Sequence, residues 1–120
     1  HYGYVLVYYN QVVGYLAMIN QEDEDYKILS NWQQTSDYVV IHRVAISSNY
    51  QGRGLANYFF SNILSIALSK GCSAVRIDTH RVNLTMQALL EKFDFVYRGI
   101  VYVASDIDGE RFAYELVIED

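Results

Sequence analysis

The chain contains no proline and only one cysteine. The single thiol, Cys72, excludes an intramolecular disulfide and a multi-cysteine metal cluster, and we expect no metal cofactor. The net charge is −5 and there is no basic tract, which argues against a nucleic-acid-binding protein. No apolar run approaches the roughly 20 residues of a membrane-spanning helix, and no signal peptide is recognisable. We therefore expect a cytoplasmic protein without a membrane partner.

Hydrophobic residues make up 52% of the 120 residues, enough for a core, so we expect one domain spanning residues 1–120. Apolar periodicity predicts the element order β-β-β-α-β-α-β-β. The expected strands are residues 4–9, 12–19, 38–46, 74–79, 95–103 and 111–118, and the expected helices are residues 55–69 and 83–93. This order indicates a mixed α/β (α+β) fold, whose sheet is antiparallel at its ends and parallel near a central β-α-β-α core.

The strand over residues 38–46 has two largely apolar faces, which is typical of a central strand covered on both sides. Period-two alternation places one set of side chains on one face, namely Tyr38, Val40, His42, Val44 and Ile46. In the long acidic connection before this strand, we interpret Trp32 as a side chain that fills the core from a loop. Gly14, inside the second strand, indicates a bulge or a close backbone approach.

A glycine loop, Gln51–Ala56, connects this central strand to the helix over residues 55–69. Glycines let the backbone approach a ligand, and a helix N-terminus carries partial positive charge, so we expect an anionic ligand group here. The phosphate-loop pattern G-x-x-x-x-G-K-[ST] is absent. The dinucleotide fingerprint G-x-G-x-x-G fits less well, because Asn57 occupies its third glycine position and only one βαβ unit is present.

The sequence Gln51-Gly52-Arg53-Gly54-Leu55-Ala56 resembles the pattern Q/R-x-x-G-x-G/A, the acetyl-CoA pyrophosphate loop of the GNAT N-acetyltransferase superfamily. About 30 residues later, Asn83–Phe95 is similar to the second signature of that family, N-x-x-A-x-x-L-Y-E-K-x-G-F. The final pair of strands also agrees. The resemblance covers nearly the whole chain and implies the GNAT fold with acetyl-CoA as cosubstrate.

The resemblance also implies where acetyl-CoA binds. Backbone groups of the central strand would hold the pantetheine arm, and backbone amides of the glycine loop would hold the pyrophosphate. Arg53 adds positive charge there or is a surface arginine, and Asn83 contacts the cofactor, caps its helix, or does both. The implied cofactor-binding residues are Val44, Ala45, Ile46, Gln51, Gly52, Arg53, Gly54, Leu55, Ala56 and Asn83.

His42 is the candidate general base. It stands where many relatives carry Glu or His, and an imidazole with an ordinary pKa of about 6.5 suits removal of a proton near neutral pH. The alternative is a structural histidine, hydrogen-bonded in the core. For His80, which follows the strand over residues 74–79, we favour a helix-capping or solvent-exposed role over a place in the cofactor channel.

The chain departs from the family pattern in three ways. The usual first strand and its following helices have no counterpart, so we expect an N-terminally incomplete domain or a wall supplied by a partner. Leu90 replaces the tyrosine that often protonates the leaving thiolate, which leaves another hydroxyl or water for that step. The candidate hydroxyls are those of Tyr97, Tyr102 and Tyr114. Asp94 replaces a glycine, which is a mild change because Asp tolerates left-handed backbone conformations.

Two functions fit these observations. The first is an N-acetyltransferase that moves the acetyl group of acetyl-CoA to a primary amine of a small molecule or peptide by direct attack in a ternary complex. The second is a non-catalytic module that binds acyl-CoA as a sensor or scaffold, which Leu90 favours. A homodimer is compatible with the tyrosine-rich composition.

Overall fold

The computed structural model describes residues 2–19, 26, 29–33, 37–47, 54–103 and 108–118. The predicted order of strands and helices is confirmed, with boundaries that shift by at most two residues. The strands are β1 (Tyr2–Tyr8), β2 (Gln11–Ile19), β3 (Tyr38–Ile46), β4 (Ala74–His80), β5 (Val96–Tyr102) and β6 (Glu110–Val117), and the helices are α1 (Leu55–Ser69) and α2 (Leu84–Lys92).

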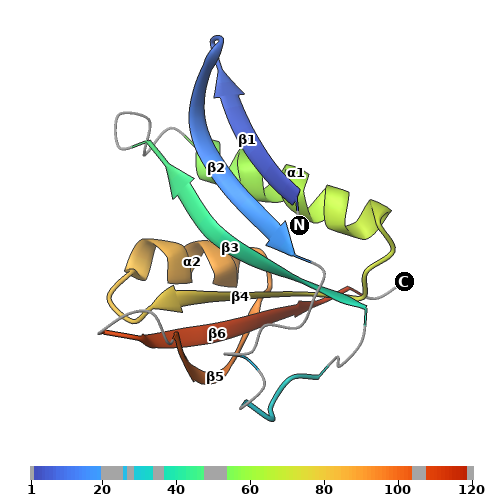
Figure 1. Cartoon of the computed structure of the whole chain (residues 1–120), viewed down its shortest axis with the longest axis vertical. Helices are drawn as coiled ribbons and strands as arrows, with labels where there is room; N and C mark the ends of the chain where they lie inside the picture. The colour runs from blue at the N-terminus through green and yellow to red at the C-terminus, as the bar shows by residue number, and fades with distance from the viewer. Residues whose placement is uncertain are drawn as a thin grey trace.

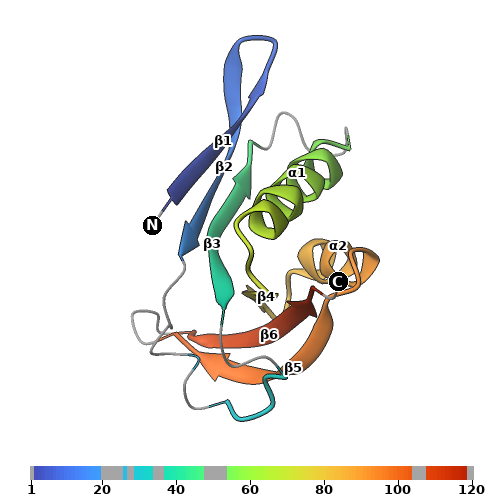
Figure 2. The ribbon, with the colours of Figure 1, turned by 90° about the vertical axis from the view of Figure 1, so that its right-hand side faces the viewer.

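Within the described residues, the strands form one six-stranded sheet in the order β1-β2-β3-β4-β6-β5. Only β3 and β4 run parallel, because α1 connects them as a crossover; the other neighbours are antiparallel. Both helices lie on the same side of the sheet (Figure 2). The mixed fold predicted from the sequence, antiparallel at its ends and parallel in the middle, is therefore confirmed.

The core has two parts, one on each face of the sheet. The larger part lies under the helices and joins Phe59, Phe60 and Ile63 of α1 to Ile41 and Ile77 of the two parallel strands. The smaller part, on the opposite face, comprises Tyr26, Trp32, Val40, Val101 and Ala113. Trp32 is buried and donates its indole N–H to the backbone oxygen of Tyr26 at 3.1 Å, so the prediction that it fills the core from the connection is confirmed.

The second helix ends in a left-handed residue, as its sequence indicates. Asp94 has φ 69°, which is the conformation that the family glycine would adopt. The amide of Asp94 donates to the carbonyl of Glu91 and the amide of Phe95 to that of Leu90, both at 3.0 Å, which satisfies the last carbonyls of the helix. Leu90 and Phe95 are both buried in the core beneath, so replacing glycine with aspartate preserves the helix end.

The side chains of β3 alternate between the two faces of the sheet, and this alternation is interrupted after His42. Tyr15 of β2 pairs with Ala45 and Ala17 with His42, so β3 has one extra residue between these pairs, a β-bulge. Val44 and Ile46 consequently pack in the same core as Ile41, under the helices. The prediction that Val44 and Ile46 share a face with Val40 and His42 is wrong, because a regular two-residue period cannot register a bulge.

Gly14 lies opposite the end of β3 and allows the strands to approach closely there. A Cβ added at Gly14 would come within 2.9 Å of Ile46 Cδ1 and 3.2 Å of the Ala45 carbonyl. The register of β1 and β2 also shifts beside it, since Leu6 pairs with Gly14 and Val7 with Val12. The sequence predicted a bulge or a close backbone approach at this glycine, and the structure has both.

Candidate active site

A cleft opens where the two parallel strands separate. The β3–β4 pairs run from Tyr38↔Ala74 to Ile41↔Ile77, whereas β3 continues to Ile46 and β4 to His80. The strands diverge from this point, as Figure 1 shows. The backbone groups of β3 and β4 beyond the last pair face a ligand-sized space instead of each other. The cleft has a volume of about 220 Å³ and is lined by Ile41, His42, Val44, Ile77, Asp78, Thr79, His80, Asn83, Met86 and Arg111.

The two sides of this cleft differ in chemistry. Toward the helices it is lined by apolar side chains, including Val44 of β3 and Met86 of α2. Toward the opposite face it is lined by His42, Asp78, His80 and Arg111. An acyl chain and a polar acceptor can therefore meet between the strands from opposite sides of the sheet, the acyl chain against apolar groups and the acceptor against ionisable ones.

The start of α1 has the backbone that an anion site requires. Gly54 is the N-cap residue and has φ 74°, a left-handed conformation that favours glycine. The backbone amide of Tyr58 donates to the carbonyl of Gly54, which makes the first hydrogen bond of the helix. The amides of Leu55 and Ala56 come before it. The first turn contains no acidic side chain, so its positive end is not neutralised locally. Gln51, Gly52 and Arg53 lie outside the described residues.

The cleft lies at the end of the sheet where both helices begin. Because β3, α1 and β4 form a parallel β-α-β unit, the N-terminus of α1 is beside the C-terminal end of β3 (Figure 1). Asn83 begins α2 at the end of β4, and its side-chain oxygen accepts the amide N–H of Met86 at 3.1 Å. The predicted capping role of Asn83 is confirmed, and Asn83 also lines the cleft. Both helices thus begin at the end of the sheet where the cleft lies, and the start of α2 forms part of the cleft wall.

None of the tyrosines considered as an acid for the leaving thiolate lines the described part of the cleft. Leu90, at the family tyrosine position, is completely buried in the core under the helices. Tyr114 is also buried in that core, and burial, followed by the charges of Glu91 and Tyr97, raises its pKa. Tyr97 and Tyr102 are exposed on β5. The structure therefore offers no tyrosine for this step among the residues described.

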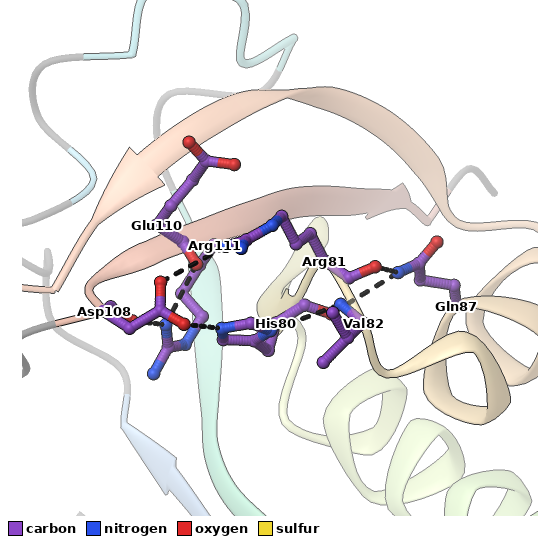
Figure 3. Close-up of polar contacts among 7 residues, drawn as sticks. All are labelled: His80, Arg81, Val82, Gln87, Asp108, Glu110 and Arg111. Carbon is purple, nitrogen blue, oxygen red and sulfur yellow. Dashed lines mark hydrogen bonds and ion pairs between the residues drawn. The ribbon is translucent and has the colours of Figure 1, made fainter.

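The imidazole of His80 makes hydrogen bonds that the sequence did not predict. Its Nδ1 accepts the backbone N–H of Val82 at 3.2 Å, so Nε2 carries the proton and donates to Asp108 Oδ2 at 2.6 Å (Figure 3). His80 also lines the cleft, the position that we considered less favoured than a capping or exposed one. Both ring nitrogens of His80 therefore make hydrogen bonds within the protein.

Asp108 joins the turn before β6 to the end of β4. It accepts from His80 and from Arg81 Nη1 at 3.2 Å, while Arg111 Nη1 donates to the backbone oxygens of Asp108 and Glu110 (Figure 3). At the other side, Gln87 of α2 donates to the backbone oxygen of Arg81 at 2.8 Å. These contacts fix one wall of the cleft. Sequence reasoning did not find Asp108 or Arg111, because their proximity to His80 depends on the pairing of β4 with β6.

The hydrogen bond from His80, followed by that from Arg81, lowers the pKa of Asp108. A carboxyl whose pKa is lower folded than unfolded stabilises the protein above its unfolded pKa, about 3.9, and loses that contribution as the pH falls through the folded pKa. We therefore expect Asp108→Asn to lower the melting temperature at pH 6 and the difference from wild type to shrink below about pH 4. Thermal melts of both proteins across this range test the prediction. A difference that grows on acidification would contradict it.

No helix in the part of the chain that the structure describes is long and apolar enough to cross a membrane. Within the same residues, no group of three or more His, Cys, Asp and Glu side chains is placed to hold a metal ion.

The chain belongs to the GNAT acetyltransferase family: the model of the Acetyltransferase (GNAT) family matches residues 1–95. A crystal structure of a GNAT-family acetyltransferase from Streptococcus agalactiae is 31% identical, with a TM-score of 0.84 over 99% of this chain and 66% of that chain. A Bacillus anthracis structure in complex with acetyl coenzyme A is 17% identical, with a TM-score of 0.73 over 98% of this chain and 62% of that chain.

A curated relative, N-acetylaspartate synthetase of Xenopus tropicalis, is 26% identical over 98 residues. The match covers 82% of this chain and 32% of that protein, so the chain spans about a third of the length of this relative. The fold and family expected from the sequence are therefore confirmed.

Proposed function

We propose that this protein transfers the acetyl group of acetyl-CoA to a primary amine of a small molecule or peptide, by direct attack in a ternary complex. The observation that carries this proposal is the separation of β3 and β4 beyond Ile41↔Ile77, which forms a cleft with His42 on its polar side. Family membership supports acetyl-CoA as cosubstrate, as does the acetyl coenzyme A complex of the Bacillus anthracis relative.

The residues at the cleft suit the parts of acetyl-CoA. Backbone groups of Val44–Ile46, beyond the last β3–β4 pair, would hold the pantetheine arm and polarise the thioester carbonyl. The amides of Gln51–Ala56 and the start of α1 would bind the pyrophosphate, for which the left-handed Gly54 and the acid-free first turn are suited. Asn83, at the start of α2, would contact the cofactor while it caps the helix.

His42 is the proposed general base. It lies at the opening of the cleft on the face opposite the helices. The acceptor amine would approach from this polar face and meet a thioester that enters from the apolar side. His80, the other histidine of the cleft, has both ring nitrogens engaged by Val82 and Asp108. The position of His42, directly after the last β3–β4 pair at the opening of the cleft, favours it over His80 as the group that removes the amine proton.

A second candidate function is a module that binds acyl-CoA without turnover. It is favoured by the buried Leu90 at the family tyrosine position and by the absence of tyrosine among the described residues of the cleft. A thiol of ordinary pKa about 8.5 leaves without strong acid assistance, so water is sufficient for the enzyme proposal. The loss of a tyrosine is therefore expected to lower the rate without abolishing the reaction.

Two measurements on the purified chain separate these functions. Calorimetry with acetyl-CoA tests the premise that both share, and mass spectrometry with a panel of primary amines tests for acetylated product. Binding followed by amine-dependent product supports the enzyme; binding without product supports the module; no binding contradicts both. Thiol release can be followed by dye as well, because Cys72 donates to the Ala67 carbonyl and burial raises its pKa, so its own reaction is slow.

A further inference from the structure

One face of β4 carries three ionisable side chains at alternate positions, Arg76, Asp78 and His80. Each contacts a different element. Arg76 is buried, with its guanidinium carbon 3.7 Å from the ring centre of Tyr38 and 4.4 Å from that of Trp32. His80 hydrogen-bonds Asp108, which lies in the turn before β6. Asp78 lies between them and is part of the cleft wall.

A buried shell fixes the orientation of Asp78. The hydroxyl of Tyr26 donates to Asp78 Oδ2 at 2.6 Å, and Tyr26 is completely buried. Trp32 in turn holds Tyr26, by a hydrogen bond to its backbone oxygen and by ring packing with the ring centres 5.3 Å apart. These contacts orient the carboxylate at the cleft, which is what a binding group requires.

Asp78 faces the general-base candidate across the opening of the cleft. His42 and Asp78 are the residues that directly follow the last β3–β4 pair, Ile41↔Ile77, and both lie on the face opposite the helices. On the other side of Asp78, its cross-strand neighbour on β6 is the small residue Ala113, and Asp78 itself lines the cleft. A small cationic group at this opening would lie between an imidazole and a carboxylate.

We propose that Asp78 binds the ammonium group of the acceptor and holds it in front of His42, so that the substrates are primary amines that are cationic in solution. This inference rests on the proposed acetyl transfer. A charge-assisted hydrogen bond from the ammonium to the carboxylate supplies the affinity and the orientation. If residue 78 only accepted the hydrogen bond of Tyr26, an uncharged acceptor oxygen would suffice. Binding an ammonium group requires the negative charge of the carboxylate.

The reaction balances with the residues named. His42 takes one proton from the bound ammonium, and the nitrogen lone pair then forms the C–N bond to the thioester carbon. The C–S bond breaks, the nitrogen loses its second proton, and the sulfur leaves and is protonated to the thiol. The products are the N-acetylated amine, free CoA and one proton released to solvent. Asp78 remains ionised throughout and changes only where the amine lies.

The decisive variant is Asp78→Asn, which keeps the shape and an oxygen that accepts the Tyr26 hydroxyl but removes the charge. With L-aspartate, L-lysine, spermidine and an alanyl tripeptide as probes, we expect KM for the best amine to rise about 10-fold or more, because one charge-assisted hydrogen bond is lost. The Kd of acetyl-CoA and the melting temperature should stay near those of wild type. An unchanged KM overturns the proposal.

Tyr26→Phe is the matched control, because it keeps the charge of Asp78 and removes only its orienting bond. We expect a smaller rise in KM than for Asp78→Asn, together with a lower melting temperature. If Asp78 is only a structural partner of Tyr26, Tyr26→Phe will lower the melting temperature and neither variant will change KM, which also overturns the proposal.

A wild-type protein that acetylates none of the probes contradicts the proposed function and leaves amine binding to be measured directly. Saturation-transfer NMR of the same amines with the acetyl-CoA complex then decides. Amine binding that Asp78→Asn abolishes supports the role of Asp78, and binding that is absent or independent of Asp78 overturns it.

Discussion

Replacing Gly54 with valine is expected to raise the Kd of acetyl-CoA by at least about 100-fold, the loss expected when two hydrogen bonds to a charged group are removed. Gly54 begins α1 in a left-handed conformation and lies beside the amides proposed to bind pyrophosphate. A Cβ added there meets no atom of the described protein within 4 Å, so the side chain would fill the space that the ligand needs. Calorimetry with acetyl-CoA measures the effect.

The same helix provides a matched control. Gly71 follows the other end of α1, has φ 78° against 74° for Gly54, and an added Cβ there also meets nothing within 4 Å. Valine at either position bears the strain of a β-branched residue at positive φ, about 1–3 kcal/mol. Gly71→Val should therefore destabilise the protein comparably and leave the affinity for acetyl-CoA unchanged. Retained affinity in Gly54→Val would mean that the phosphates bind elsewhere.

Replacing His42 with alanine is expected to lower the rate of acetyl transfer at pH 7 by about 100-fold or more, the usual contribution of a general base. His42 lies at the polar opening of the cleft, whereas the proposed contacts to acetyl-CoA come from backbone beyond it and from the start of α1. The Kd of acetyl-CoA should therefore stay within about twofold of wild type. Steady-state kinetics with a saturating amine and calorimetry provide the two values.

Two comparisons separate a chemical role of His42 from a structural one. Added imidazole should restore part of the rate of His42→Ala if the side chain acts as a base, and should have no effect if it only packs in the protein. His80→Ala should lower the rate less than His42→Ala, because His42 directly follows the last β3–β4 pair, whereas His80 lies farther from that pair, at the end of β4. A His42→Ala protein as fast as wild type would exclude His42 as the base.

The elements that local pattern determines were predicted closely. The boundaries of α1 follow from the helical spacing of its apolar residues, the left-handed Gly71 at its C-terminal end and the glycine before its start. The boundaries of β3 coincide with the run of β-branched and aromatic residues between polar segments. The left-handed conformation of Asp94 was also predictable, since aspartate replaces a glycine at a helix end.

The predictions failed, or were absent, where the outcome depends on distant partners. The bulge that moves Val44 and Ile46 to the helix face arises from the pairing of β3 with β2, and a two-residue period in one strand cannot register it. Alternating charges in Arg76, Asp78 and His80 were visible in the sequence. Their meaning depends on Tyr26, which is 52 residues from Asp78, and on Asp108, which is 28 residues from His80.

A crystal structure of the protein with acetyl-CoA tests the central claim most directly. We predict that the thioester lies between β3 and β4 beyond Ile41↔Ile77, with its carbonyl against the backbone of Val44–Ile46, the pyrophosphate at the start of α1 and the acetyl group directed toward His42 and Asp78. Acetyl-CoA bound outside this cleft, or with its acetyl group directed away from His42, would contradict the account.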